Sequence, residues 1–401
     1  MKKSSGYPTR AEVLDKFFDN WAAPKRAELV ATAEAYGRVL SEDVFSLVDK
    51  PVFRASSMDG IAVKAAAFAN GIPSAEGWKL GTDYVRADTG DDFPDEYDAV
   101  VQIEDVTLLE NGGVRFAEDM EGPIVPGWNV TPQGANIRKG ALIGRRGTKL
   151  SPCELAALSI GAVSSVNVFK KPVAVFIPTG NELVTLGTEP RRGQAVDSNS
   201  LMAVHLLREM GAEASAYPIV KDDKAALAAA LDRALAEADI VVINAGTSKG
   251  EEDYCHALIA DKGTQIAHGV AAAPGKPMAL GIVNGKPVIN VAGPPVACFN
   301  GLDWCVRPIV SAFLERPLPV RRKVKAKLAE AISAGGGERF EAIVRIELEE
   351  TPEGYLAHPV SHRNRHTTDA LLAGGLYVTK LVPEPNGAGD TIEVDILSID
   401  N

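Results

Sequence analysis

The sequence predicts a multidomain protein that combines α/β and β structure, and three observations carry this prediction. A chain of 401 residues is too long for one hydrophobic core, so we expect roughly two to four domains. Between residues 172 and 312, apolar β-branched runs alternate with helical patterns, which is typical of a mostly parallel sheet covered by helices. Residues 51–135 and 320–401 instead show short runs broken by glycine and proline, which indicates β-rich domains.

The changes in sequence texture suggest four domains. An N-terminal helical and extended domain takes residues 7–45 and 136–167, and a β-rich second domain takes residues 46–135. A central, mostly parallel α/β domain covers residues 168–317. Residues 318–401 form a small C-terminal domain that resembles a β-barrel.

Composition excludes several classes of protein. The formal charge of −11 argues against nucleic acid as a partner, because phosphate contacts require a basic face. No apolar run reaches the roughly 18 residues that would suggest a membrane span, and the first residues lack the apolar segment of a signal peptide. We therefore expect a globular protein of the cytoplasm.

The cysteine pattern indicates neither a disulfide framework nor a zinc site. The four cysteines form no C-x-x-C pair and no cluster with histidine, and they are Cys153, Cys255, Cys298 and Cys305. Cys298 and Cys305 are seven residues apart on one expected helix, which predicts a buried stripe.

In the first half of the chain, capping residues mark the expected elements. Thr9 caps a helix over 11–20, and a second helix over 24–36 ends at Gly37. A third helix begins after Ser151, with Pro152 at its first position, and ends at Gly161. Asn111, Gly112 and Gly113 predict a hairpin turn.

The α/β region alternates regularly. The expected strands are 172–177, 214–220 and 239–244, and the expected helices are 198–210, 223–237 and 250–261. In the second of these helices Leu227, Leu231 and Leu235 form an apolar stripe. A hairpin at 284–285 and a last long helix complete the region.

Polar residues follow each of the three expected strands. Thr179–Glu182 follows the first strand, Asp222 the second and Ala245–Asp253 the third. Ligands of open α/β sheets bind at the carboxyl ends of the strands, so these groups predict a binding site. In the third group, small residues allow backbone N–H groups to approach an anion, although its acidic residues 251–253 also fit ordinary helix capping. The sequence contains no Walker A or G-x-G-x-x-G motif.

Five motifs, taken together, carry a family resemblance. They are SSMDGIAV (56–63), PTGNEL (178–183), DSN (197–199), AGTSKGEEDY (245–254) and PGKPMALG (274–281). In this order they resemble the molybdopterin molybdenumtransferases of the bacterial MoeA and gephyrin E-domain type, and the resemblance covers nearly the whole chain. Considered alone, Asp59 would be read as an ordinary turn carboxylate.

The resemblance implies a fold, a reaction and an assembly. Each subunit has four domains, including a molybdopterin-binding α/β domain, and two subunits form a homodimer in which that domain faces the β-rich domain of the partner. The reaction converts adenylylated molybdopterin and molybdate into molybdenum cofactor, releases AMP and uses Mg²⁺. A molybdoenzyme or another protein of the cofactor pathway is a further expected partner.

The resemblance also implies roles for individual residues. The expected catalytic residues are Asp59, Glu182, Asp222, Asp253 and Lys276. The expected cofactor-binding residues are Thr89, Thr179, Gly180, Asp197, Asn199, Gly246, Thr247, Ser248, Gly250 and Pro295. Asp59, Glu182 and Asp253 are the expected metal ligands. Chemically, the carboxylates suit a divalent cation and the lysine offsets the charge of an anion.

The chain departs from the family pattern at several of these motifs. Gly269 and Ala273 stand where the family has lysines, and Asn181 replaces an aspartate. Residues 290–295 replace a GLPGNP turn and keep one glycine and the last proline, and a carboxylate after residues 136–138 has no counterpart. The turn 361–366 carries His362, Arg363, Arg365 and His366, which fits either a solvated loop or an anion site.

Three functional interpretations remain open. The first, which we favour, is a molybdenumtransferase with altered site chemistry. The second is a molybdopterin-binding carrier or insertion partner without the transfer activity. The third is an enzyme of the same scaffold that acts on another oxyanion or pterin. Loss of two lysines removes cations from a site that must attract molybdate, and this loss separates the first interpretation from the other two.

Overall fold

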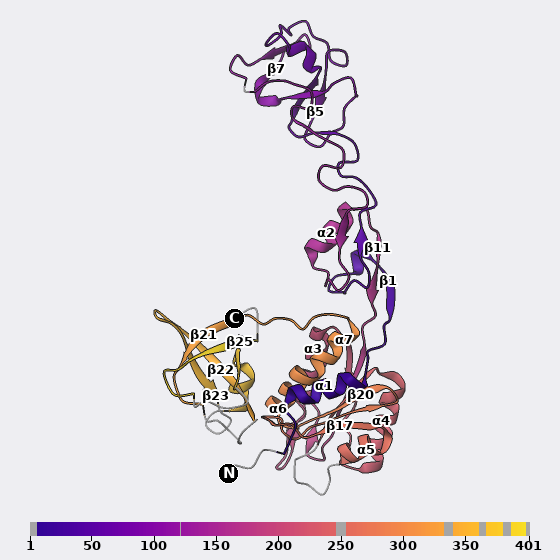
Figure 1. Ribbon diagram of the computed structural model, residues 1–401, viewed down its shortest axis with the longest axis vertical. Coiled ribbons are helices and arrows are strands. Elements are labelled where there is room, and N and C mark those ends of the chain that lie inside the picture. The colour runs from indigo at the N-terminus through magenta and orange to yellow at the C-terminus, as the bar shows by residue number, and fades with distance from the viewer. Residues whose placement is uncertain are drawn as a thin grey trace. The chain divides into compact units, whose positions relative to one another are not determined.

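The computed structural model describes residues 6–120, 122–245, 254–332, 340–360, 366–379 and 386–397 (Figure 1). The chain forms two compact units. Residues 27–169 form one unit, which we call the inserted unit. Residues up to 26 and from 170 onward form the other, which we call the α/β unit, so two separated pieces of sequence build it. The boundaries of the four expected domains are finer than this division and stay a prediction.

A six-stranded sheet organises the α/β unit, in the order β15, β12, β16, β20, β19, β17. These strands are β12 (Val173–Pro178), β15 (Glu213–Ala216), β16 (Ile240–Asn244), β17 (Thr264–His268), β19 (Ala279–Val283) and β20 (Lys286–Val291). β15, β12, β16 and β20 are parallel, whereas β19 is antiparallel to both of its neighbours. The predicted mostly parallel sheet is confirmed, as is the hairpin at 284–285, which joins β19 to β20. The second expected strand is shorter than predicted.

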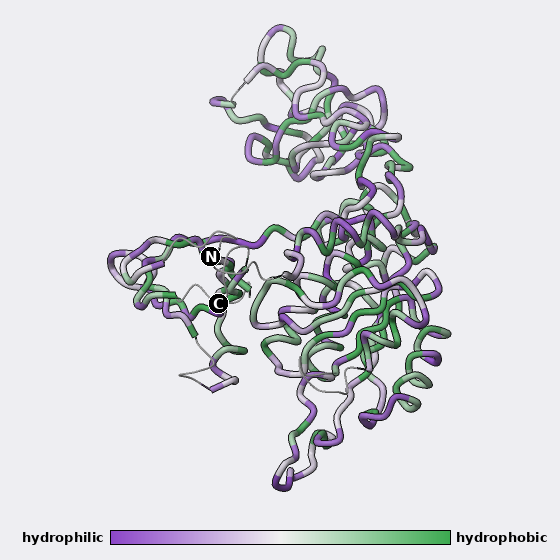
Figure 2. Tube along the Cα trace, turned by 60° about the horizontal axis from the view of Figure 1, so that its bottom comes forward, coloured by the Kyte–Doolittle hydropathy of each residue, from purple (hydrophilic) through white to green (hydrophobic). Residues whose placement is uncertain are grey.

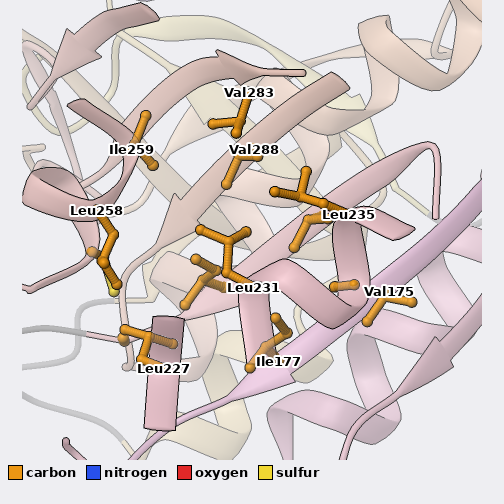
Figure 3. Close-up of a cluster of buried hydrophobic side chains, with 14 of the residues drawn as sticks. Val175, Ile177, Leu227, Leu231, Leu235, Leu258, Ile259, Val283 and Val288 are labelled. Atoms are coloured by element: carbon orange, nitrogen blue, oxygen red, sulfur yellow. The ribbon is translucent and has the colours of Figure 1, made fainter. Parts of the chain in front are cut away.

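Helices cover both faces of this sheet (Figure 1). The helices are α3 (Asn199–Met210), α4 (Lys224–Glu237), α5 (Tyr254–Lys262), α6 (Pro295–Gly301), the π-helical η4 (Leu302–Val306) and α7 (Arg307–Phe313). α4 and α5 pack on one face, and the predicted leucine stripe of α4 is buried there: Figure 3 shows Leu227, Leu231 and Leu235 among side chains of the sheet. The expected last long helix is the continuous run from α6 to α7. Gly211 ends α3 with a φ of 110°, as its position predicts.

Helix α1 (Arg10–Asn20) belongs to the α/β unit although it lies at the start of the chain. Thr9 and Glu12 form the capping box that fixes its first turn. Val13 and Phe17 are buried, and the ring of Trp21 lies 5.4 Å from that of Phe313 in α7. The first expected helix is therefore confirmed, and its apolar face packs on residues far along the sequence.

The C-terminal part of the α/β unit is a closed five-stranded barrel. Its strands are β21 (Lys323–Leu328), β22 (Glu341–Thr351), β23 (Gly354–Val360), β24 (Gly375–Val378) and β25 (Thr391–Ile396). β22 pairs with β23, β23 with β21, β21 with β25, β25 with β24 and β24 again with β22, which closes the ring. β18 (Ala272–Ala273) adds to β22, and α8 (Thr367–Leu372) lies between β23 and β24 in sequence. The expected barrel-like domain is confirmed.

In the inserted unit, one predicted helix is wrong. Residues 24–36 contain β1 (Ala27–Ala31) and the 3₁₀ turn η1 (Thr32–Glu34), and β1 pairs antiparallel with β11 (Ser165–Phe169). Alanine, glutamate and leucine favour a helix locally, but the backbone hydrogen bonds to β11 override that preference. Helix α2 (Pro152–Ile160) forms as expected, with a capping box between Ser151 and Glu154. β2 (Val44–Phe45) pairs with β10 (Leu142–Gly144).

The β-rich part of the inserted unit has short strands and a small core. The remaining elements are β3 (Ala55–Ser56), β4 (Gly60–Val63), η2 (Ala65–Phe68), β5 (Tyr84–Ala87), β6 (Ala99–Gln102), η3 (Ile103–Asp105), β7 (Val106–Leu108), β8 (Val114–Phe116) and β9 (Val130–Thr131). β7 and β8 form the hairpin expected at 111–113. Figure 2 shows hydrophobic segments interleaved with hydrophilic ones along the chain. Within the described ranges, no helix is both long and apolar enough to cross a membrane.

Candidate functional site

The carboxyl ends of the four parallel strands form one edge of the sheet, and expected site residues meet there. The backbone N–H of Asn181, in the turn after β12, donates to Asp222 Oδ2 at 3.3 Å, and that of Asp222 donates to Asn181 Oδ1 at 3.3 Å. Gly180 N–H donates to Val220 O at 3.1 Å. Two of the three polar groups that the sequence places after strands are thus in contact. Of the third group, Ala245 is described, whereas Gly246, Thr247, Ser248, Gly250 and Asp253 lie outside the described residues.

Gly180 sits where a side chain would collide with a site carboxylate. Its φ is 152°, and a Cβ built on it would lie 2.7 Å and 2.9 Å from the two carboxylate oxygens of Glu182. Glu182 and Asp222 are both exposed, so their carboxylates are accessible to a ligand. The positive φ therefore favours glycine at position 180, and a Cβ there would push the flexible Glu182 carboxylate out of this orientation.

Asn244, the last residue of β16, ties the edge together, and our sequence analysis missed it. Its side-chain Nδ2 donates to Val291 O at 3.2 Å and to Ala292 O at 2.9 Å, just after β20. Its carbonyl oxygen accepts from Thr179 N at 3.0 Å and from Thr179 Oγ1 at 3.2 Å. Its Oδ1 accepts from Asn199 Nδ2 at 2.9 Å. A buried amide at the end of an otherwise apolar strand was the signal that could have found it.

The starts of two helices are attached to the same edge. Asn199 begins α3 and donates through Nδ2 to Gly293 O at 2.6 Å as well as to Asn244. Asp197 Oδ1 accepts from Ser200 N at 3.0 Å, which fixes the turn before α3. Pro295 is the first residue of α6 and follows Gly293 closely in the chain. Of the expected residues, Asn199 and Pro295 therefore lie at the turn after β20, and Asp197 lies in the turn that precedes α3.

Lys276 lies on a segment that packs against α6. Asn300 Nδ2 donates to Pro274 O at 3.0 Å, and a Cβ on Gly275 would lie 3.6 Å from Ala297 O. The exposed Lys276 side chain places Nζ 4.6 Å from the centroid of the Tyr7 ring. Tyr7 is a second residue that the sequence analysis missed, because nothing in the local pattern relates it to position 276.

The inserted unit holds its own pair of expected residues. Thr89 donates to Asp59 Oδ1 through its backbone N–H and through Oγ1, both at 2.7 Å. These hydrogen bonds, the one from the backbone first, lower the pKa of the exposed Asp59 carboxyl, so it is ionised at neutral pH. Asp59 stands just before Gly60, whose Cβ would meet Val101 O at 2.0 Å, so strand β4 requires glycine there. A turn carboxylate accounts for the Asp59 geometry as fully as a ligand site does.

The basic turn expected at 361–366 is described only at His366, which caps α8; residues 361–365 lie outside the described residues. The described segments on either side of residues 361–365 pack against α6. Val360, Ala370 and Ala373 form a small buried cluster against Val296, the residue after Pro295.

The described residues contain no group of three or more histidine, cysteine, aspartate or glutamate side chains that could hold a metal ion. Of the expected metal ligands, Asp59 is in the inserted unit and Glu182 in the α/β unit.

Two family models match the chain. The model described as the MoeA N-terminal region, domains I and II, matches residues 9–161. The model described as a probable molybdopterin binding domain matches residues 176–312, which include the sheet and its polar edge.

Individual relatives agree with these matches. The chain is 31% identical over 336 residues to a putative molybdopterin biosynthesis protein of Methanocaldococcus jannaschii, a match that covers 79% of this chain and 81% of the relative. It is 28% identical over 316 residues to a molybdopterin molybdenumtransferase of Haemophilus influenzae, covering 76% of this chain and 77% of the relative. Among solved structures, a molybdopterin biosynthesis MoeA protein from Pyrococcus horikoshii matches with a TM-score of 0.81 and 28% identity, covering 98% of this chain and 99% of that chain.

Proposed function

We propose that this chain, which belongs to the molybdopterin molybdenumtransferase family of the MoeA type, inserts molybdenum from molybdate into adenylylated molybdopterin. The reaction releases AMP. The observation that supports this proposal most directly is the Asn244 network. It joins the turn at Thr179, the start of α3 and the turn before Pro295 into one polar edge, which is where ligands of parallel sheets bind.

We assign separate roles in substrate binding and charge neutralisation to the described residues of this edge. Thr179 and Gly180 provide a turn that a phosphate or pterin can approach closely, and Asn199 holds the start of α3 beside it. Glu182 and Asp222 are exposed carboxylates at the same edge. Lys276 supplies positive charge toward the anionic substrates. Gly246, Thr247, Ser248 and Gly250 keep their expected cofactor-binding roles in this proposal, and Asp253 keeps its expected catalytic and metal-binding roles.

The donor chemistry fits Mg²⁺. This ion prefers oxygen ligands and often binds through one or two carboxylates together with substrate phosphates, so a protein cluster of three acidic residues is not required. Asp59, whose pKa is lowered, and the exposed Glu182 are such carboxylates, and Asp253 is the third ligand that we propose. A bound Mg²⁺ ion neutralises charge on the phosphoanhydride.

The proposed site is shared between two subunits of a homodimer. Asp59 and Asp253 belong to different parts of the chain, and the family arrangement brings the β-rich domain of one subunit to the α/β domain of the other. Mixing Asp59→Ala subunits with Asp253→Ala subunits should therefore restore part of the activity, since some hybrid dimers hold one intact site. A monomer at micromolar concentration in sedimentation would contradict this arrangement.

One structural observation favours the second interpretation, a molybdopterin-binding carrier. Gly269, where the family has a lysine, has a φ of 82°, and a Cβ built there would lie 2.4 Å from Cε1 of the Tyr7 ring. A lysine cannot replace this glycine without moving Tyr7. Two like charges at about 4 Å repel by about 4 kcal/mol at an effective dielectric of 20, so losing a cation weakens the attraction of molybdate to an anionic site.

The deciding experiment measures binding and insertion separately. Calorimetry with molybdopterin measures binding, and formation of molybdenum cofactor across a molybdate titration measures transfer. Transfer at any molybdate concentration supports the enzyme, whereas tight pterin binding without transfer supports the carrier. Transfer with another oxyanion such as tungstate, and none with molybdate, supports the third interpretation.

We expect normal pterin binding but weak transfer at micromolar molybdate. Ala273→Lys should improve transfer, because Ala273 lies on β18 beside Ala342 and is partly exposed. Gly269→Lys is the control that should fail, since its side chain displaces Tyr7. Efficient transfer by the unmodified chain at micromolar molybdate would show that the lost lysines do not matter. Unchanged transfer in the double variant Arg363→Ala, Arg365→Ala would show that the basic turn does not replace the charge of those lysines.

A further inference from the structure

Among the residues that the structure describes, an aromatic ring and not a carboxylate contacts the Lys276 ammonium. Its Nζ lies 4.6 Å from the centroid of the Tyr7 ring. Across the described ranges of the chain, no aspartate or glutamate forms an ion pair with it. The Lys276 side chain is long and exposed, so without a contact it would sample many rotamers. Contact with the ring restricts it to one side.

The Tyr7 ring is partly exposed and covers Gly269 with one edge. It lies over Gly269, where a Cβ would come within 2.4 Å of Cε1 and 2.5 Å of Cδ1. The absence of a side chain at position 269 therefore creates the space that the ring occupies. No larger residue could stand there without a shift of Tyr7.

The backbone around the ring is anchored on both sides. Pro8 O accepts from Ala271 N at 2.8 Å, and Arg10 donates to both carboxylate oxygens of Glu341 on β22, at 2.6 Å and 3.1 Å. On the opposite side, Val270 N donates to Lys276 O at 3.1 Å. The start of the chain and the segment that carries Lys276 are thus tied to the same short stretch, residues 269–271.

An aromatic face and a carboxylate hold an ammonium group with different consequences. A carboxylate partner cancels the positive charge, whereas the ring attracts the ammonium through its quadrupole and leaves the full charge for a third group. For a lysine that must attract an anion, positioning without neutralisation is the useful arrangement.

We propose that Tyr7 is a positioning residue that directs the Lys276 ammonium toward the anionic substrate, and that residues 7–10 are therefore part of the substrate site. This inference rests on the proposed function. It assigns a binding role to the first described residues of the chain, which the five sequence motifs do not include.

The test compares Tyr7→Leu with Tyr7→Phe. Leucine removes the π face, and phenylalanine keeps it. Because cation–π contacts at exposed sites are weak, Tyr7→Leu should raise KM for molybdate by roughly two- to fivefold and leave kcat unchanged, and Tyr7→Phe should restore the lower KM. Tyr36→Leu is the matched control, since Tyr36 is 67% exposed and contacts no cation in the described part of the chain.

A double-mutant cycle separates positioning from a general structural effect. In a Lys276→Met background, Tyr7→Leu should have no further effect on KM, because its action passes through the missing ammonium. An additive effect in that background, or equal effects of Tyr7→Leu and Tyr7→Phe, would overturn the proposal.

An NMR measurement tests the contact without relying on activity. After reductive ¹³C-methylation of lysines, the Lys276 signal, assigned with Lys276→Arg, should show a ring-current shift that Tyr7→Leu abolishes and Tyr7→Phe retains. Absence of that shift in the unmodified chain refutes the Tyr7 contact. A clear shift in a chain that transfers no molybdenum would instead refute the proposed enzyme while leaving the contact intact.

Discussion

Replacing Asn244 with alanine should loosen the polar edge of the sheet, and the structure allows the size of the effect to be worked out. The change removes two donated hydrogen bonds, to Val291 O and Ala292 O, and one accepted from Asn199. At roughly 0.5–1.5 kcal/mol for each bond, the cost of losing the three bonds is about 1.5–4.5 kcal/mol. Asn199 retains its bond to Gly293 O, and the backbone contact with Thr179 is unchanged, so the loss should stay local.

A second buried asparagine provides the control. Asn290, on the neighbouring strand β20, is 5% exposed, compared with 4% for Asn244. Its Oδ1 has no hydrogen-bond partner in the described part of the chain. Asn290→Ala therefore removes an unsatisfied polar atom and should cost about 1 kcal/mol or less.

Native-state hydrogen exchange is the suitable assay, because a chain with two units need not unfold in one step. In Asn244→Ala, amides at the ends of β12 and β20 should exchange roughly 10- to 2,000-fold faster, which corresponds to about 1.5–4.5 kcal/mol. Asn290→Ala should leave those amides within about tenfold of the unmodified rate. Equal exchange in the two variants would refute the view that the Asn244 side chain holds the edge.

Three further predictions concern other parts of the chain. Gly180→Ala should lower pterin affinity by about tenfold, because its Cβ displaces the Glu182 carboxylate. Gly187→Ala is the control: Gly187 has a φ of 91° and no atom of the described residues within 4 Å of a built Cβ, so this variant should retain affinity in the same calorimetric titration. Iodoacetamide at pH 8 should modify the exposed Cys153 and spare the buried Cys298 and Cys305 until denaturant is added. Burial raises the pKa of both buried thiols, that of Cys305 to about 12. Rapid labelling of Cys305 would contradict this packing. Leu231→Ala should destabilise the α/β unit by about 2–5 kcal/mol, measured by native-state hydrogen exchange of the α4 amides. Leu186 is 73% exposed, so Leu186→Ala should have little effect, and equal exchange in the two variants would count against the α4 core.

Local signals predicted most of the helices and much of the edge. The capping pairs at Thr9 and Ser151 and the glycine at 211 each fix a helix end through atoms only a few residues away. The turn after β12 was predictable for a related reason. In a parallel sheet, residues that follow successive strands must meet at one edge, so the meeting of Asn181 and Asp222 follows from their order in the chain.

Features that depend on distant partners were not predictable from one sequence. The alanine-rich segment 27–31 is a strand because of residues 165–169, which no local pattern connects to it. The order of strands in the barrel and the position of Tyr7 over Gly269 also depend on contacts between residues distant in sequence. Asn244 is a different case, because a polar residue at the end of an apolar strand can be recognised in the sequence. Its role could not be predicted, because that role depends on hydrogen bonds to residues distant in sequence.

The early position of α1 in the sequence has a consequence during synthesis of the protein. Lys16 donates to Ile266 O, a partner 250 residues further along the chain. At about 5–20 residues per second, a ribosome needs roughly 12–50 s to deliver that partner after α1 has emerged. During this interval Trp21, which is buried in the finished fold, still lacks Phe313, the ring of α7 against which it packs. The packing of α1 on α7 therefore waits until both segments of the α/β unit have been synthesised.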